Sequence, residues 1–225
     1  MENALVNVQV IYEKIAQHFD ETRTSHWTKV KEFILSLPRN SFLLDIGCGN
    51  GKYASVRKDI YYIGTDITLP LLYKSKFHTV STEVFRSSCI DKLPIKPASM
   101  DAILHIAVLH HFATYEERLR ILLSFFHYLS LSGRLIVTVW AYEQSNVKKR
   151  DVKWKRISSD TTDYLIPWLD KHTKVTYQRF YHLFPKEEIC QLIDDILQIY
   201  SNYESILSFD CDNWVVEFRP KQICL

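Results

Sequence analysis

A doubly wound α/β domain is the fold class that this sequence of 225 residues predicts. Three observations lead to it. Short apolar runs of strand length alternate with stretches of helical periodicity, glycines cluster after the first of these runs, and two strand-like segments end the pattern. Because no internal repeat, low-complexity run or linker interrupts the alternation, residues 1–225 are expected to form a single domain.

The individual elements follow from periodicity and from the residues that interrupt it. Residues 1–40 are expected to hold two opening helices, over 6–19 and 26–37, with Thr and Ser of the polar stretch 20–25 able to cap the second. The expected strands are 42–46, 61–66, 83–86, 100–106, 134–140, 203–210 and 214–219, and the later helices are 70–77, 115–129 and 186–199. Residues 142–180 are polar and basic without clear periodicity, which predicts an inserted loop on the substrate side. The last two strands should form an antiparallel hairpin around 211–213.

Composition excludes several classes of protein. The 28 Lys and Arg against 26 Asp and Glu give a net charge of +2, so no global basic field indicates nucleic acid. A hydrophobic content of 47% excludes disordered, collagen-like and coiled-coil chains. No apolar run reaches the roughly 20 residues that cross a bilayer, and the N-terminus lacks a signal-peptide pattern. With 5 scattered cysteines and no C-x-x-C, we expect reduced thiols, no zinc site, and a cytoplasmic location with the nucleus as the alternative.

The glycine cluster Asp45-Ile46-Gly47-Cys48-Gly49-Asn50-Gly51 follows the first predicted strand. Open α/β sheets bind ligands where such strands end, and glycines let the backbone approach a ligand closely. The spacing is G-x-G-x-G, whereas dinucleotide-binding proteins use G-x-G-x-x-G to hold a pyrophosphate. An acid two residues before the first glycine repels phosphate and attracts an ammonium group.

These features predict a site for S-adenosylmethionine (SAM), which offers an ammonium and a ribose but no phosphate. Asp66, which ends the second strand, is placed to accept hydrogen bonds from both ribose hydroxyls, and Cys89 and Ile90 are expected to contact the adenine. The predicted cofactor-binding residues are Asp45, Gly47, Cys48, Gly49, Gly51, Asp66, Ile67, Cys89, Ile90 and Ile106. The alternative is a tight turn with Asp45 as a cap and Cys89 as a small buried residue, but it accounts for neither Asp66 nor the hairpin.

Other blocks of sequence occur in fewer protein families than the cofactor motif does. They are Tyr12-x-x-Ile15-Ala16-x-His18-Phe19 with Thr22-Arg23 and Trp27, Ile106-Ala107-Val108-Leu109-His110-His111, Val139-Trp140-Ala141-x-Glu143-Gln144, Asp163–Trp168 and Arg179–Phe184. Together with the glycine motif they cover nearly the whole chain. In these residues it resembles the SAM-dependent tRNA methyltransferases that esterify the carboxymethyl group on wobble uridine, including the methyltransferase part of AlkB-type fusion proteins.

The resemblance implies a fold, a reaction and a binding partner. The fold would be that of class I SAM-dependent methyltransferases, a Rossmann-like seven-stranded sheet with a C-terminal antiparallel hairpin. The reaction would convert 5-carboxymethyluridine at the anticodon wobble position into its methyl ester, 5-methoxycarbonylmethyluridine. Two alternatives remain: a SAM-dependent carboxyl methyltransferase for a small molecule or protein, and a non-catalytic SAM-fold scaffold.

Methyl transfer to a carboxylate requires no general base, because the acid is already ionised at neutral pH. The site must instead position that acid, and the planar fork of an arginine matches a carboxylate. Arg23 is the candidate, since the resemblance places an arginine there beside the cofactor mouth. The alternative is a solvated surface arginine.

Three more residues are candidates for the catalytic site at the carboxyl edge of the sheet. His110 and His111 follow the fourth strand, and one of them is expected to orient the substrate or the uracil ring. The alternative is that one packs under the helix 115–129 while the other caps it. Tyr142 follows the fifth strand together with Glu143, and either can contact the nucleotide. Glu143 alternatively forms an ion pair with Lys148.

One segment is strongly basic although the chain is nearly neutral. Its six cationic residues are Lys148, Lys149, Arg150, Lys153, Lys155 and Arg156, with Trp154 among them. Basic side chains interleaved with aromatic rings suit an anticodon loop, whose bases stack on rings while its phosphates meet cations. The alternative is a solvated basic loop.

The resemblance also implies a small zinc-binding activator subunit as a partner. The short strand Glu83–Arg86 is expected at the edge of the sheet, where a strand of the partner can pair with it. Nearby apolar residues would be covered by the same contact; they are Leu71, Leu72, Phe77, Val84 and Phe85. The alternative is that these side chains fill the protein's own core.

Overall fold

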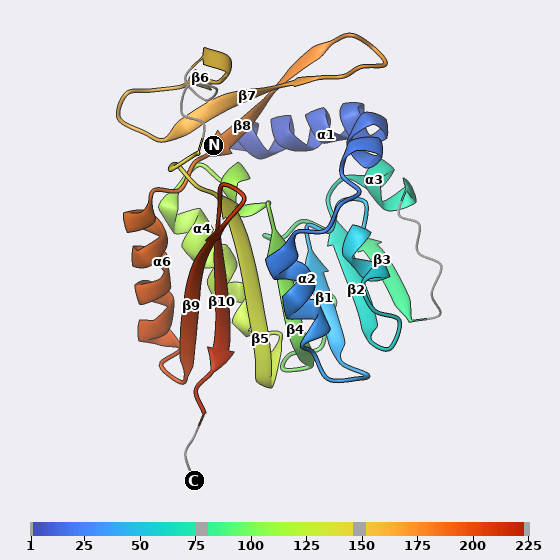
Figure 1. Ribbon diagram of the computed structural model, residues 1–225, viewed down its shortest axis with the longest axis vertical. Helices are drawn as coiled ribbons and strands as arrows, with labels where there is room; N and C mark the ends of the chain where they lie inside the picture. The colour runs from blue at the N-terminus through green and yellow to red at the C-terminus, as the bar shows by residue number, and fades with distance from the viewer. Residues whose placement is uncertain (1, 75–80, 146–151, 223–225) are drawn as a thin grey trace.

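A seven-stranded sheet forms the centre of the computed structural model, which describes residues 2–74, 81–145 and 152–222 (Figure 1). The strands lie in the order β3-β2-β1-β4-β5-β10-β9. Their bounds are β1 Phe42–Ile46, β2 Tyr61–Asp66, β3 Thr82–Arg86, β4 Met100–Ile106, β5 Leu129–Trp140, β9 Tyr203–Asp210 and β10 Asn213–Pro220. The first five are parallel, whereas β10 pairs antiparallel with both β5 and β9. This order confirms the predicted fold class and the C-terminal hairpin.

Helices cover both faces of this sheet. On one face α4 (Tyr115–Phe126) and α6 (Lys186–Ile199) bury apolar side chains against β4, β5 and β10. On the other face α2 (Thr28–Leu35) packs with Leu43 and Leu104 of the central strands. Because β1 and β4 are covered on both faces, their sequences are continuous apolar runs, which is why these strands could be predicted.

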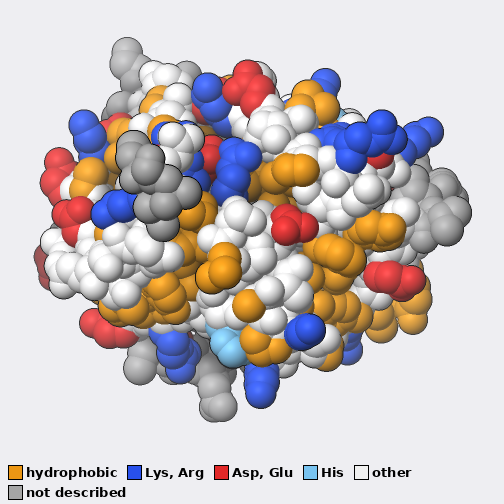
Figure 2. Space-filling model, turned by 90° about the horizontal axis from the view of Figure 1, so that it is seen from below, with side chains coloured by type: hydrophobic (Ala, Val, Ile, Leu, Met, Phe, Trp, Pro, Cys, Tyr) orange, Lys and Arg blue, Asp and Glu red, His pale blue; other side chains and the backbone are white. Residues whose placement is uncertain are grey.

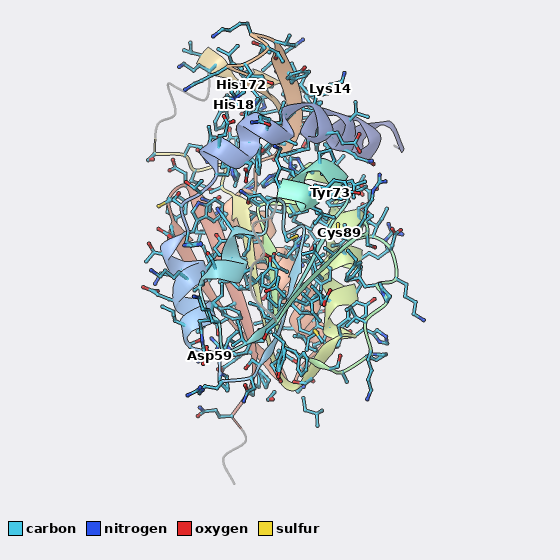
Figure 3. All side chains as sticks on the ribbon, turned by 90° about the vertical axis from the view of Figure 1, so that its right-hand side faces the viewer. Lys14, His18, Asp59, Tyr73, Cys89 and His172 are labelled. Carbon is cyan, nitrogen blue, oxygen red and sulfur yellow. The ribbon has the colours of Figure 1, made fainter. Side chains whose placement is uncertain are left out.

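The first helix lies across the carboxyl ends of the parallel strands. This helix, α1 (Glu2–Thr22), packs against α3 (Leu69–Lys74) and β8, and short 3-10 helices η1 (Lys52–Ser55) and η2 (Leu109–His111) lie beneath it (Figure 1). Figure 3, which looks onto the β3 side, shows Lys14 and His18 on α1 above Tyr73 on α3. The position of α1 turns the carboxyl edge of the sheet into a covered site.

Residues 142–180 are not the unstructured insertion that their composition predicted. They contain β6 (Lys155–Arg156), β7 (Asp163–Leu169) and β8 (Thr176–His182), which form an antiparallel three-stranded sheet beside α1. In β7 the buried residues Tyr164, Ile166 and Trp168 alternate with half-buried and exposed ones. The alternation is hidden in the sequence because apolar Leu165 and Pro167 lie between them.

Three predicted helices differ from the expectation in their boundaries, their cap or their described extent. The predicted helix 115–129 ends at Phe126, and Leu129 already pairs with Met100 as the first residue of β5. The second helix begins after Trp27, whose side chain makes no capping hydrogen bond, so the Thr and Ser before it do not cap it. The predicted helix 70–77 is helical to Lys74, and its last residues lie outside the described part.

The strand at the edge of the sheet is β3, as predicted. However, Leu71 and Leu72 of α3 are 2% and 6% exposed, and half-buried Val84 and Phe85 pack against the two core clusters. These side chains therefore fill the protein's own core rather than an open apolar patch, and Phe77 lies outside the described residues. Within the described residues, no helix is long and apolar enough to span a bilayer.

The opposite end of the molecule carries mixed charge. Figure 2 shows this face, where Lys and Arg side chains alternate with Asp and Glu side chains between hydrophobic patches. Phe42 and Tyr61, at the amino ends of β1 and β2, stack with ring centroids 4.9 Å apart and are 42% and 43% exposed. The described residues of this face thus carry both signs of charge, unlike the single-signed surface that is typical of nucleic-acid binding.

Candidate active site

A cavity lies under α1 at the carboxyl ends of β1, β2 and β4. Its empty volume, which includes solvent space at the open mouth, is about 1260 Å³. The wall consists of α1, the glycine loop, the ends of β2 and β3, η2 and two residues of β8. The cavity is thus built by elements that are far apart in the sequence and meet at the carboxyl edge of the sheet.

The glycine loop forms one wall because its backbone is left-handed at three positions. Gly47, Gly49 and Gly51 have φ angles of 83°, 56° and 64°, which other residues rarely adopt. A Cβ atom on Gly47 would lie 2.3 Å from Val108 Cγ2, whereas one on Gly49 would meet its first neighbour, Phe19 Cε1, at 3.7 Å. Gly47 is thus required for close packing against the β4 loop, and Gly49 leaves the loop open to a ligand.

Asp66, at the end of β2, holds the glycine loop and borders the cavity. Its Oδ2 accepts a hydrogen bond from the Gly49 N–H at 2.8 Å, and its Oδ1 accepts one from the Thr68 N–H at 2.7 Å. Burial raises the pKa of Asp66, although these two N–H groups act in the opposite direction. Each carboxylate oxygen has a second lone pair, so the group can still accept hydrogen bonds from two adjacent hydroxyls.

Asp45 is the second acid of this end of the cavity and is only 1% exposed. The Tyr62 hydroxyl donates to its Oδ2 at 2.6 Å. Burial raises the pKa of Asp45 to about 7, despite the Tyr62 hydrogen bond. A bound cation would favour the ionised acid, so the site is suited to an ammonium group.

The residues present at this end fit SAM. Asp45 and Asp66 offer acceptors that suit its ammonium and its ribose, and Cys48, Ile67, Cys89 and Ile106 add apolar surface to the lining. All the predicted cofactor residues border the cavity except Gly51 and Ile90. Gly51 lies in the turn behind the cavity, and Ile90 is 48% exposed. In the part of the chain that is described, no group of three His, Cys, Asp or Glu side chains is arranged to hold a metal ion.

The opposite end of the cavity is aromatic and basic. His111 is 6% exposed and borders the cavity, with Nδ1 2.9 Å from the Phe180 carbonyl and Nε2 3.2 Å from the Tyr12 hydroxyl. Burial lowers the pKa of His111 to about 3, so its ring is neutral. His110 is fully buried, stacks on Tyr181 at 4.3 Å, and lies outside the lining.

His111 thus borders the cavity, and His110 does not. The alternative that one of them caps the following helix is wrong. The helix after them is capped by Thr114, whose side chain accepts from the Glu117 N–H at 3.2 Å in a capping box. Neither histidine caps this helix.

Arg23 borders the cavity mouth and is exposed. Its guanidinium lies over Trp168, with Cζ 5.0 Å from the ring centroid, and its Nη1 donates to the Thr22 carbonyl at 3.3 Å. Asn50 of the glycine loop donates to the Arg23 carbonyl at 3.4 Å. The backbone of Arg23 is therefore bonded to the glycine loop, while its guanidinium lies over Trp168 of β7.

Tyr142 does not reach the cavity. Its N–H donates to the Phe184 carbonyl at 2.9 Å, and its side chain packs beside the second sheet. Glu143 accepts from the Lys186 N–H at 3.0 Å and from Trp214 Nε1 at 3.2 Å, so it ties α6 to the hairpin. A nucleotide contact of either residue outside the cavity stays a prediction, and Lys148 lies outside the described residues.

The basic segment is divided between described and undescribed residues. Lys148, Lys149 and Arg150 lie outside the described part, whereas Lys153, Lys155 and Arg156 are exposed on and before β6. Trp154 is not free to stack on a base, because its ring lies 5.5 Å from Trp140 and 6.3 Å from Tyr164. It packs the second sheet onto β5.

Four residues at the aromatic end were not predicted as site residues. Tyr12, Trp140, Arg179 and Tyr181 all border the cavity. All four lie in the sequence blocks that carry the family resemblance, and Arg179 and Tyr181 project from the same side of β8, two residues apart. Since the sequence concealed that strand, their shared face was not recognised.

A buried charge network attaches the second sheet to the helices below. His182 of β8 lies 2.7 Å from Asp163 and 2.8 Å from Glu188, and Glu188 lies 2.7 Å from Arg118 of α4. Burial would lower the pKa of His182, but its hydrogen bonds to Asp163 and Glu188 outweigh this and raise it. The network fixes the end of the strand that carries Arg179 and Tyr181.

Comparison with known proteins agrees with this site. A family profile described as a methyltransferase domain matches residues 44–137. The tRNA (carboxymethyluridine(34)-5-O)-methyltransferase of Schizosaccharomyces pombe is 33% identical over 232 residues, which are 93% of this chain and 94% of that protein. The chain belongs to the tRNA (carboxymethyluridine(34)-5-O)-methyltransferase family.

Other members of this methyltransferase family are longer. ALKBH8 of Mus musculus is 39% identical over 163 residues, which are 71% of this chain and 24% of that protein. The chain therefore spans about a quarter of this curated relative. A methyltransferase of Haloferax volcanii, solved in complex with the Trm112 methyltransferase activator, shares the fold with a TM-score of 0.64 at 13% identity, covering 96% of this chain and 98% of that one.

Proposed function

We propose that this protein is a SAM-dependent tRNA methyltransferase that converts 5-carboxymethyluridine at the wobble position into 5-methoxycarbonylmethyluridine. The observation that carries the proposal is the relationship at 33% identity to a family member of which the chain covers 94%. The cavity supports it, because one end has the acids and glycines that suit SAM and the other end is basic and aromatic.

The reaction needs little chemistry from the protein. SAM, when bound, supplies a methyl group on a positively charged sulfur. Asp45, Asp66 and the glycine loop would hold SAM, whose methyl group would be transferred to a carboxylate oxygen of the substrate, with the electron pair of the broken C–S bond staying on sulfur. An anion and a cation become two neutral products, and no proton is transferred. The residues must therefore bind, align and desolvate, which can contribute up to about 7–11 kcal/mol in well-oriented systems.

The neutral His111 fits such a site. Because burial holds its pKa near 3, the ring cannot protonate the substrate acid at neutral pH. Its Nδ1 faces the Phe180 carbonyl, which can only accept, so Nδ1 carries the proton and Nε2 accepts from Tyr12. His111 thus orients Tyr12 at the substrate end rather than acting as a base.

Exposed Lys153, Lys155 and Arg156 support contact with tRNA phosphates, together with the three basic residues before them in the sequence. We also propose a small zinc-binding activator subunit as a partner on the outer edge of β3, where the described sheet ends. Tyr73 on the neighbouring α3 is 80% exposed on this side of the molecule (Figure 3). An added strand would pair with the free backbone groups of β3.

Methylation of defined RNA tests the function. The full chain, alone and with the activator subunit, is incubated with labelled SAM and with anticodon stem-loops carrying uridine or 5-carboxymethyluridine at the wobble position. We expect methyl ester only on the acid-bearing RNA, and nucleoside analysis of tRNA from cells without the protein should show the ester replaced by the acid. Equal labelling of free carboxylic acids, or an unchanged nucleoside profile, would refute the proposal.

A further inference from the structure

Arg179 is a buried cation without an anionic partner. Its side chain is 4% exposed and borders the cavity. Among the described residues, no carboxylate lies within ion-pair distance of it, whereas buried Arg118 is paired with Glu188 at 2.7 Å. Burying an unpaired charge is costly, so a guanidinium in this state indicates a site whose anion comes from elsewhere.

Its immediate neighbours are aromatic rings. The Arg179 Cζ lies 4.7 Å from the ring centroid of Trp168, 5.0 Å from that of Tyr181 and 5.9 Å from that of Tyr12. Such contacts contribute only about 0.5–2 kcal/mol each and leave the positive charge uncompensated. The rings hold the guanidinium flat and in place without neutralising it.

The hydrogen bonds around Arg179 form a chain in which each donor can be assigned, from Arg179 through Tyr181 and Tyr12 to His111. Tyr12 donates to His111 Nε2, so its oxygen can only accept from the Tyr181 hydroxyl, 3.2 Å away. The Tyr181 oxygen in turn accepts from Arg179 Nη1 at 2.8 Å, and Nη1 also lies 3.3 Å from the Tyr12 oxygen. These contacts occupy Nη1 alone. The Nε donor is buried with no partner, and together with Nη2 it forms one of the two edges that can grip a carboxylate.

Arg23 and Arg179 lie near one another but differ in their burial and in their hydrogen-bond partners. Both lie over Trp168, and desolvation together with the charge of Arg179 lowers the pKa of Arg23. Arg23 is exposed and tied to the glycine loop through Asn50, whereas Arg179 is buried and tied to His111 through the two tyrosines. The two guanidinium groups therefore differ in burial and in hydrogen bonding: that of Arg23 is exposed at the mouth, and that of Arg179 is buried and bonded to the tyrosines.

We propose that Arg179, rather than Arg23, binds the carboxylate of the substrate and selects the acid over neutral analogues. This assignment rests on the proposed function and identifies its recognition residue. Asp45 and Asp66 at the other end repel the same carboxylate, so only one orientation of the substrate is favourable. The cation and the phenols around it then place a carboxylate oxygen between Arg179 and the cofactor end.

Two matched RNAs test the proposal. Anticodon stem-loops carry either 5-carboxymethyluridine or 5-carbamoylmethyluridine, which replaces the acid by a neutral amide of the same shape. Their affinities for the full chain, produced with the activator subunit, are compared for the parent, Arg179→Gln, Arg179→Lys and Arg23→Gln. The affinity of each variant for S-adenosylhomocysteine is measured by calorimetry, and thermal unfolding shows whether it is folded.

We expect the parent to prefer the acid by about 10- to 100-fold, as for a charge-assisted pair. Arg179→Gln should lose this preference, Arg179→Lys should keep part of it, and neither should weaken S-adenosylhomocysteine binding by more than a few-fold. Arg23→Gln should keep the preference. The proposal is wrong if Arg179→Gln still prefers the acid, if Arg23→Gln loses the preference instead, or if Arg179→Gln loses cofactor affinity to the same extent as RNA affinity. A parent that prefers the acid but transfers no methyl group would refute the proposed function while supporting the role of Arg179.

Discussion

The Glu188→Gln substitution should show how strongly the second sheet is fixed to the rest of the protein. The Glu188 carboxylate lies 2.7 Å from Arg118 Nη2 and 2.8 Å from His182 Nε2, and these partners are 4% and 8% exposed. Loss of its charge leaves the buried Arg118 guanidinium without a carboxylate partner, and the guanidinium keeps its hydrogen bond to the Phe112 carbonyl at 2.8 Å. Breaking a buried pair from one side costs about 3–5 kcal/mol.

The lower end of that range applies here. Glu188 itself is 19% exposed, and the amide of glutamine keeps one acceptor for Arg118. A loss of about 3 kcal/mol in the free energy of unfolding corresponds to a fall in Tm of about 6–12 °C for a chain of this size. Urea and thermal unfolding followed by circular dichroism measure both quantities.

Glu187→Gln is the matched control. Glu187 precedes Glu188 in the first turn of α6, where either acid interacts with the helix dipole, but its side chain is exposed. The control should therefore lose only the dipole contribution of about 0.3–1 kcal/mol. If the Tm values of the two variants agreed within about 2 °C, corresponding to less than about 1 kcal/mol, the buried network would contribute nothing measurable.

Three further predictions concern pH, the glycine loop and RNA binding. The pKa of His182 is raised in the folded protein, so protonated His182 stabilises the fold. This stabilisation is complete below the pKa of about 6.5 that histidine has in the unfolded chain, and it is lost as the pH rises through the pKa of the folded protein. The parent should therefore lose stability over that pH interval, and His182→Asn should not. Gly47→Ala, whose Cβ would lie 2.3 Å from Val108, should lower both the Tm and the SAM affinity measured by calorimetry. Adding Val108→Ala should recover only part of the lost Tm and affinity, because the backbone strain at a φ of 83° remains. The last prediction concerns alanine replacement of all six basic residues, Lys148, Lys149, Arg150, Lys153, Lys155 and Arg156. It should weaken tRNA binding and reduce the slope of log K against log salt concentration by about 0.7 for each lost phosphate contact. An unchanged slope would exclude these residues from the interface.

The sheet and the cofactor end could be predicted because their signals are local. Strands β1 and β4 are apolar runs covered on both faces, and the glycine loop and Asp66 follow directly at strand ends. The order of the strands then brings Asp45 and Asp66 to one edge. Each of these steps uses residues within one strand or the turn after it.

The substrate end could not be predicted in the same way. Tyr12 and Arg179 meet across 167 residues of sequence, and their contact depends on α1 packing against β8. Strand β8 itself was concealed in a segment that its charges marked as a loop. Trp154 was expected on the surface for the same reason, whereas it packs against Trp140. Local patterns identify a ligand site more readily where one loop builds it than where distant elements meet.

The two ends of the cavity carry opposite charge, and this polarity bears on both binding and release. Asp45 and Asp66 attract a cation at one end, while Arg179 offers an unpaired positive charge at the other. A cationic methyl donor and an anionic acceptor are each attracted to a different end, which aligns them before the reaction. Methyl transfer removes both charges, because the acid becomes an ester and the sulfonium becomes a thioether. Neither product then makes the ion pair that favoured binding of its precursor, so the same residues that select the acid favour departure of the ester.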